Sequence, residues 1–169
     1  FIDAASRRNL ELTETLRDKN KHGSLLWVLD RTKTAMGARF LRNLLEKPLL
    51  GIPEIEARQD AIQEFLSRYI DREELREYLA PIYDMERLMG RITLGSANAR
   101  DMLAFGSSIA ALPPIKDLLQ SFSAPLLRSF SQSLDDLRDL SALLACAIAD
   151  DPPLTLREGH IIKDGYHED

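Results

Sequence analysis

Cysteine is almost absent from the 169-residue chain, in which Cys146 stands alone within the apolar run "LLACAIA". A disulfide within the chain is therefore excluded, which fits a reducing compartment, and we expect Cys146 to be a small buried hydrophobe. No apolar stretch reaches the roughly 18 residues that a membrane span needs, and no signal peptide is visible. These features predict a cytoplasmic protein without a membrane partner.

The motifs of the common enzyme classes are also missing. The sequence has no G-x-x-x-x-G-K-[ST] phosphate loop and no G-x-G-x-x-G, and none of its three histidines accompanies a recognisable nucleophile elbow. Basic charge is scarce as well, because 22 Lys and Arg face 27 Asp and Glu, for a net charge of −5. A protein that binds nucleic acid through bulk electrostatics is normally basic, so direct duplex binding by this chain is disfavoured.

The chain does contain enough apolar sequence for one domain, with 44% hydrophobic and 29% charged residues. Apolar residues recur at helical spacing, and candidate caps and prolines mark the helix ends. Ser24 is a candidate cap for a short helix, and Thr34 for a helix that ends at Pro48. Further helices are expected at about 53–69, 71–80, 98–112, 115–120 and 126–148, the last with a possible break near 131–133.

Both ends of the chain have a different pattern. Residues 1–12 alternate with period two and predict a strand-like segment. Residues 154–166 predict a hairpin that turns at Glu158-Gly159. The expected fold is thus all-α: a multi-helix orthogonal-type bundle with a short strand-like N-terminal segment and a small C-terminal hairpin. Within it, Trp27 is interpreted as a core residue rather than a binding platform.

The stretch "YDMERLMGRITLGSANARDM", residues 83–102, has the densest mixture of acids and arginines. Helical spacing puts Asp84, Arg87 and Arg91 on one face, and Asn98 and Asp101 have the spacing of a capping box. Acid–base chemistry would need carboxylates that face each other in a cleft. Ionic bracing and capping explain these residues with fewer assumptions, so we predict no catalytic residue here.

Two other groups could bind ligands. The tail residues Glu158, His160, Asp164, His167 and Asp169 are metal-ligand types, but their spacing matches no known cage, and a solvated hairpin is favoured. The pair Arg7-Arg8 could touch phosphate, although a solvated face is the simpler interpretation. We therefore predict no catalytic, cofactor-binding or metal-binding residue in this chain.

Four segments, taken together in this order, resemble the MutS family of DNA mismatch-repair ATPases: "DAASRRNLEL", "GSLLWVLDRTKTAMGARFLRNLLEKPLL", "YDMERLMGRITLGSANARD" and "AIADDPPLTLREGHIIKDGY". The resemblance is to the helical core or lever domain, domain III, and covers essentially the whole chain. The sequence departs from the family pattern at Ser6, Ala99 and His160, where Thr, Pro and a second Gly are common.

The resemblance implies a structural, signal-transmitting domain that links a DNA clamp to an ATPase. ATP and Mg²⁺ would be bound elsewhere in a parent that is a DNA-dependent ATPase and a homodimer. Residues 1–169 would be the first segment of the core domain, without the clamp, mismatch-reading and ATPase domains, and the first residue, Phe1, fits a piece of a longer protein. Its partners would be those domains and, through them, mismatched duplex DNA. The alternative is an independent helical protein-interaction domain without enzymatic activity.

Overall fold

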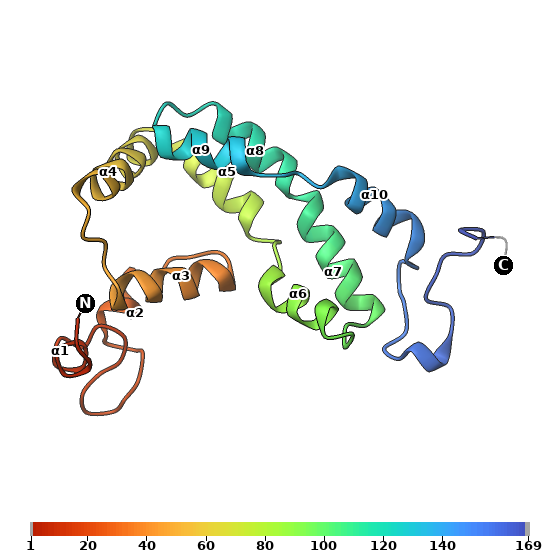
Figure 1. The fold of residues 1–169 in the computed structure, drawn as a ribbon, viewed down its shortest axis with the longest axis horizontal. Helices are drawn as coiled ribbons and strands as arrows, with labels where there is room; N and C mark the ends of the chain where they lie inside the picture. The colour runs from red at the N-terminus through yellow and green to blue at the C-terminus, as the bar shows by residue number, and fades with distance from the viewer. Residues whose placement is uncertain (1, 168–169) are drawn as a thin grey trace.

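The computed structural model describes residues 2–167, and every regular element in that range is helical, which confirms the all-α class. Figure 1 shows an elongated molecule with the N-terminal helices at one end and the C-terminal segment at the other. The helices are α1 (Ala4–Asn9), α2 (Leu25–Leu29), α3 (Ala35–Glu46), α4 (Ile52–Ser67), α5 (Tyr69–Leu79), α6 (Met85–Thr93), α7 (Ala99–Ala110), α8 (Leu112–Gln120), α9 (Pro125–Ser133), α10 (Arg138–Ala147) and a 3-10 helix (Leu156–Glu158).

Side-chain caps start several of these helices where the sequence predicted them. Ser24 accepts a hydrogen bond from the Trp27 amide at the start of α2, and Thr34 accepts one from the Gly37 amide at the start of α3. Asn98 and Asp101 form the predicted capping box of α7. These contacts satisfy amides that a helix cannot pair internally, so local sequence sets the helix starts.

The N-terminal segment is a helix, and the predicted strand is wrong. Asp3 caps α1 by accepting hydrogen bonds of 2.9 Å from the Ala5 and Ser6 amides. This cap, followed by two alanines, favours a helical turn over the period-two alternation on which the strand rested. Phe1, part of the same prediction, lies outside the described residues.

Two buried clusters form the core. The first is built on α4, α5, α8 and α9 and contains Phe122 and Leu127. The second is built on α6, α7 and α10 and contains Phe105, Ile109 and Leu144. Helices α7 and α8 follow each other along the molecule, so together they run through both clusters (Figure 1).

The stretch Ala99–Gln120, formed by α7 and α8, is long and apolar enough to cross a membrane by length and composition, with 39% of its most apolar window buried. The expectation that no stretch reaches this length is therefore wrong. The double proline breaks the helix at Ala111 alone and lies in the first turn of α8, where proline is tolerated. The buried apolar residues of Ala99–Gln120 pack in the two clusters described above, as those of a core helix do.

The segment predicted as one helix or a broken pair over 126–148 is a broken pair. Helix α9 ends at Ser133, and α10 begins at Arg138 after Leu137, which has a left-handed backbone with φ of 46°. Leu137 still packs against the second cluster. The apolar spacing continues across the break, so periodicity alone did not locate it.

The predicted C-terminal hairpin is not formed. Its expected turn is a 3-10 helix with a Thr155–Glu158 capping box, and Ile162 pairs as an isolated antiparallel bridge with Ile148, beyond the expected arms. Gly159 and His160 both have positive φ, of 73° and 53°. A left-handed backbone conformation costs energy for most residues other than glycine, so His160 is strained where Gly159 is not.

Two predictions of burial are also wrong. Trp27 is 43% exposed and lies against His22, with ring centroids 4.2 Å apart. Cys146 is exposed. On α4, the apolar residues Ile62 and Leu66 are likewise exposed, while Ala61 is buried. Helical spacing identifies an apolar face but does not say whether another element covers it.

The left-handed backbone at Leu137 gives a test of the break between α9 and α10. In a helix interior, glycine is about 1 kcal/mol less stable than alanine. At a left-handed residue the order reverses, because glycine adopts positive φ without steric cost. Chemical denaturation should therefore find Leu137→Gly at least as stable as Leu137→Ala, with both less stable than wild type. A variant Leu137→Gly that is about 1 kcal/mol less stable than Leu137→Ala would instead indicate a continuous helix.

Candidate functional site

The charged stretch 83–102 joins α6 to a distant helix. Asp84 caps α6 by accepting a hydrogen bond from the Arg87 amide. The same carboxylate accepts two hydrogen bonds from Arg39 of α3, of 2.6 and 2.8 Å, and Arg39 also donates to Glu86. Spacing alone could not find Arg39, because it lies 45 residues from Asp84 in the sequence.

Arg87, the partner that helical spacing predicted for Asp84, contributes less to stability than Arg39 does. Arg87 approaches the Asp84 carboxylate at 3.4 Å, but its side chain is 80% exposed. Exposed pairs of this kind contribute about 0 to 1 kcal/mol. The hydrogen bond from Arg39 holds the pKa of Asp84 below its usual range, although desolvation opposes it, and the pKa of Arg39 is raised in turn. Asp84 is therefore a fixed anion at neutral pH.

A second junction connects α6 to α7. Arg91, in the last turn of α6, donates to Asp101 over 2.8 Å. Asp101 is buried, and its other carboxylate oxygen accepts from the Asn98 amide at the start of α7. One carboxylate thus completes the capping box and binds the preceding helix. The sequence predicted the capping box but not Arg91 as its partner.

A third junction lies in the first cluster. Glu64 of α4 accepts hydrogen bonds of 2.6 Å from the Ser123 and Ala124 amides at the start of α9. Desolvation would raise the pKa of Glu64, but these two amides and the nearby Arg68 and Arg128 keep it lowered. Arg68 also donates to the Ser121 carbonyl and lies over the Phe122 ring. Glu64 therefore fixes the segment that leads into α9, about 60 residues later in the chain.

These junctions share one arrangement, in which a carboxylate at a helix N-terminus also contacts an arginine. The charge-assisted hydrogen bonds stabilise the ionised form, and the helix dipole favours a negative charge at that end. A general acid or base instead needs a proton that it can exchange with a substrate in a cleft. The geometry therefore supports bracing between helices.

The candidate metal ligands of the tail are not brought together. In residues 2–167, no group of three or more His, Cys, Asp or Glu side chains could hold a metal ion. Asp169, part of the predicted set, lies outside the described residues. Nearby, Lys163 pairs with Asp150 over 2.6 Å.

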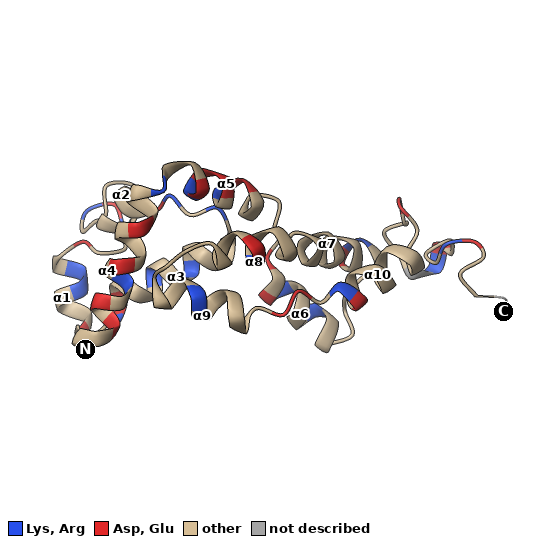
Figure 2. Ribbon diagram, turned by 90° about the horizontal axis from the view of Figure 1, so that it is seen from above, with Lys and Arg blue, Asp and Glu red and all other residues tan. Residues whose placement is uncertain are grey.

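Arg7 and Arg8 lie in the last turn of α1 rather than on a strand. Arg7 lies 3.6 Å from Glu46 of α3, and both arginines line a shallow depression together with Glu14 and Glu46. These two carboxylates would oppose a phosphate. Across the rest of the ribbon, Lys and Arg mix with Asp and Glu instead of forming a single basic face (Figure 2).

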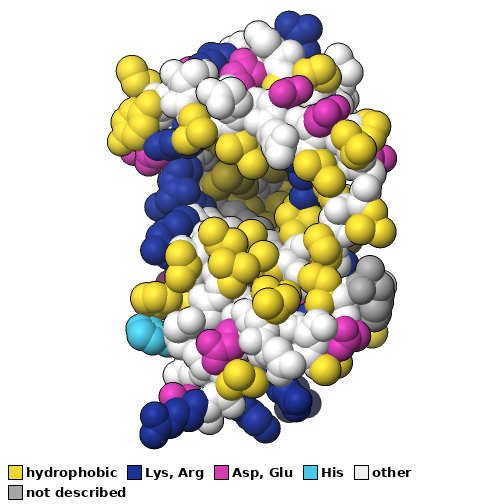
Figure 3. Space-filling model, turned by 90° about the vertical axis from the view of Figure 1, so that its left-hand side faces the viewer, with side chains coloured by type: hydrophobic (Ala, Val, Ile, Leu, Met, Phe, Trp, Pro, Cys, Tyr) yellow, Lys and Arg dark blue, Asp and Glu magenta, His cyan; other side chains and the backbone are white. Residues whose placement is uncertain are grey.

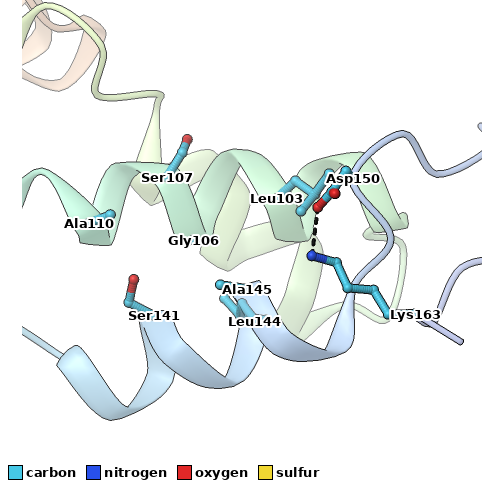
Figure 4. A pocket seen from close by; sticks show the side chains of 9 residues that line it. All are labelled: Leu103, Gly106, Ser107, Ala110, Ser141, Leu144, Ala145, Asp150 and Lys163. Carbon is cyan, nitrogen blue, oxygen red and sulfur yellow. Dashed lines mark ion pairs between the residues drawn. The ribbon is translucent and has the colours of Figure 1, made fainter. Parts of the chain in front are cut away.

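A groove of about 270 Å³ lies between α7 and α10. Small residues, including Gly106, Ala110 and Ala145, line it, and the Lys163–Asp150 pair lies at one end (Figure 4). Gly106 allows the close approach, because a Cβ there would lie 3.3 Å from the Leu144 Cβ. The groove contains no convergent set of catalytic groups.

Large apolar side chains are exposed on two surfaces. One surface is α2 and the other is the α4–α5 face, where a second depression of about 270 Å³ lies against Ile62 and Leu66. Figure 3 shows a hollow at the N-terminal end of the molecule with hydrophobic side chains around it. The exposed residues are Leu25, Trp27, Val28 and Leu29 on α2, and Ile52, Ile62, Leu66, Tyr69 and Ile70 on α4 and α5. Exposed apolar patches of this kind mark interaction surfaces.

The Asp84 junction gives a pH-dependent prediction. Asp84→Asn should lower the free energy of unfolding at pH 7 by about 1 to 3 kcal/mol, because a bidentate ionic contact is weakened. The hydrogen bond from Arg39 keeps the pKa of Asp84 below its ordinary value in the folded protein. Its contribution is therefore complete above roughly pH 5 and is lost as the pH falls through the folded-state pKa.

Urea denaturation from pH 7 to pH 3 measures this difference, which should shrink only below about pH 4. The control is Asp117→Asn on the exposed side of α8, which should change stability by less than about 0.5 kcal/mol. A difference between wild type and Asp84→Asn that stays constant down to pH 3 would contradict the ionic role.

Comparison with known proteins identifies the family. Residues 5–167 match the family model of MutS domain III. The chain is 57% identical over 166 residues to the DNA mismatch repair protein MutS of Lachnoclostridium phytofermentans, covering 98% of this chain and 18% of that protein. The same-named proteins of Ruminiclostridium cellulolyticum and Bacillus subtilis are 50% and 46% identical over 167 residues, which cover 99% of this chain and 19% and 20% of theirs. The chain thus spans about a fifth of the length of these relatives. The chain belongs to the MutS family, in which it corresponds to domain III.

Proposed function

We propose that this chain is the structural and signal-transmitting core of a DNA mismatch repair protein, and that it links a DNA clamp to an ATPase. The observation that carries the proposal is that charged side chains connect helices to one another. Asp84, Asp101 and Glu64 each join one helix to the start of another, and each accepts hydrogen bonds from backbone amides and pairs with an arginine. Charge used in this way fixes the relative positions of helices, which a transmitting scaffold requires.

The parent's other activities are assigned to its other domains. ATP and Mg²⁺ would bind there, because this chain has no phosphate loop. Mismatched duplex DNA would also bind outside this chain, whose net charge of −5 opposes contact with phosphates. The parent would be a cytoplasmic homodimer. The exposed faces of α2 and α4–α5 would pack against the remaining domains of the same polypeptide.

The same exposed faces also favour a second candidate, an independent helical domain that binds another protein. The reading frame of the parent discriminates between the two. A clamp followed by a phosphate-loop ATPase supports the core domain, and their absence supports the independent domain.

Transmission can be tested at the α6–α7 junction in the full-length parent. Asp101→Asn weakens the contact with Arg91 and leaves a neutral hydrogen-bonding side chain of the same size. We expect basal ATP hydrolysis to be retained and the mismatch-dependent change in hydrolysis to be reduced severalfold. Steady-state hydrolysis with and without mismatched duplex measures both.

In the same assay the control Asp117→Asn should respond like wild type. Stability, followed by circular dichroism, separates a loss of transmission from a loss of fold. A full mismatch response in destabilised Asp101→Asn would assign this junction to packing alone.

DNA binding gives a separate test. The chain by itself should not prefer mismatched over matched duplex at about 0.15 M salt, because its charge opposes phosphate binding. A mobility-shift titration with both duplexes measures this preference. A clear preference for the mismatch would overturn the assignment of DNA recognition to the other domains.

A further inference from the structure

Helices α1–α3 form a unit, here called the N-terminal lobe, that is separate from α4–α10, here called the body. The lobe has its own buried residues, Leu12 and Leu26, whose backbones pair through a hydrogen bond of 2.8 Å. Residues 47–51, with Pro48 and Gly51, connect lobe and body without a helix. In Figure 1 the lobe lies below α4 and reaches across to α6.

Arginine side chains make most of the described contacts between lobe and body. Arg39 of α3 binds Asp84 and Glu86 at the start of α6, as described above. From the body, Arg76 donates to the Arg31 carbonyl over 3.1 Å. Also from the body, Arg58 lies 5.5 Å from the centre of the Phe40 ring, which is exposed.

Apolar contact across the same boundary is small. Within residues 2–167, Met36 is the one lobe side chain that packs against either buried cluster. Phe40 on the lobe and Ile62 and Leu66 on the body remain exposed. Figure 3 shows the corresponding hollow between the two parts, with Lys and Arg side chains along one edge.

The two kinds of contact differ in strength. Apolar burial drives stable docking in proportion to the area removed from water, whereas partly exposed ion pairs and single hydrogen bonds contribute less and the ion pairs are screened by salt. A boundary held mainly by exposed arginines therefore opens at low cost, as inter-domain contacts of this type do.

We propose that the N-terminal lobe is hinged at residues 47–51 and moves on the body, with Arg39 and its two carboxylates as the latch. The latch acts on α6, because Asp84 is also the cap of that helix. Helix α6 in turn holds α7 through Arg91 and Asp101. The closed lobe thus stabilises the start of the helix that leads into the second cluster. As a route for transmission, this hinge rests on the proposed function above.

Distance measurement by electron spin resonance in the full-length protein tests the hinge. Spin labels replace Arg17 on the lobe and Asp117 on the body, both exposed, in a chain whose native cysteines are substituted. A reference pair at Gln63 and Asp117 lies within the body. The latch variant is Arg39→Gln, which keeps a polar side chain but removes the charge.

The matched control is Arg87→Gln. Arg87 also pairs with Asp84, but both residues belong to the start of α6, so this pair does not cross the boundary. We expect Arg39→Gln to raise the population of altered lobe–body separations roughly tenfold over wild type. The control and the reference pair should keep their wild-type distributions.

Two results would overturn the hinge: a lobe–body distribution in Arg39→Gln equal to that of wild type, or an equal change in Arg87→Gln. If Arg39→Gln does not fold, salt provides the second measurement on the unsubstituted latch. Raising salt from 0.05 to about 0.5 M should increase the altered population severalfold, and no increase would reject the proposal.

Mismatch-dependent ATP hydrolysis in the same variants separates the hinge from the proposed function. If the lobe–body separation changes but mismatch-dependent ATP hydrolysis does not, the hinge is supported and has no role in transmission. A changed response with an unchanged separation rejects the hinge and leaves transmission to another contact.

Discussion

An ionised carboxylate at the N-terminus of a helix is the interaction on which most of this structure depends. Asp84, Asp101 and Glu64 each accept hydrogen bonds from backbone amides in, or just before, the first turn of a helix. Each carboxylate also contacts an arginine side chain, so that it binds the start of a helix and pairs with a cation at the same time. Removal of either partner would leave a charge without compensation, which explains why these residues occur in pairs.

The ionic contacts matter most at the boundary between lobe and body, where apolar packing is smallest. The two buried clusters hold α4–α10 together through side chains such as Phe122 and Ile109. The N-terminal lobe has only Met36 packed against these clusters in the described part of the chain, and arginines make its other described contacts with the body. The body is therefore packed mainly through apolar side chains, whereas the described boundary between lobe and body is mainly polar and ionic.

Much of the apolar surface has no covering element among residues 2–167. Ile62 and Leu66 follow the helical spacing of a core face but are exposed on α4. This exposure agrees with a domain that makes up about a fifth of its relatives, since further polypeptide would supply the missing cover. Trp27 was expected in the core for the same reason. The sequence specifies a large apolar side chain but not whether another element covers it.

The sequence by itself determined the all-α class, the family resemblance and most helix boundaries, because caps such as Thr34, Asn98 and Asp101 act over three residues. It also predicted ionic bracing in the stretch 83–102, where Asp84 and Asp101 accept hydrogen bonds from arginines. Only the tertiary structure decided which partners meet, since Arg39 and Asp84 are 45 residues apart and Glu64 and Ala124 are 60 residues apart. It also decided the left-handed backbone at Leu137 and the pairing of Ile162 with Ile148, because both depend on where the neighbouring helices pack rather than on local propensity.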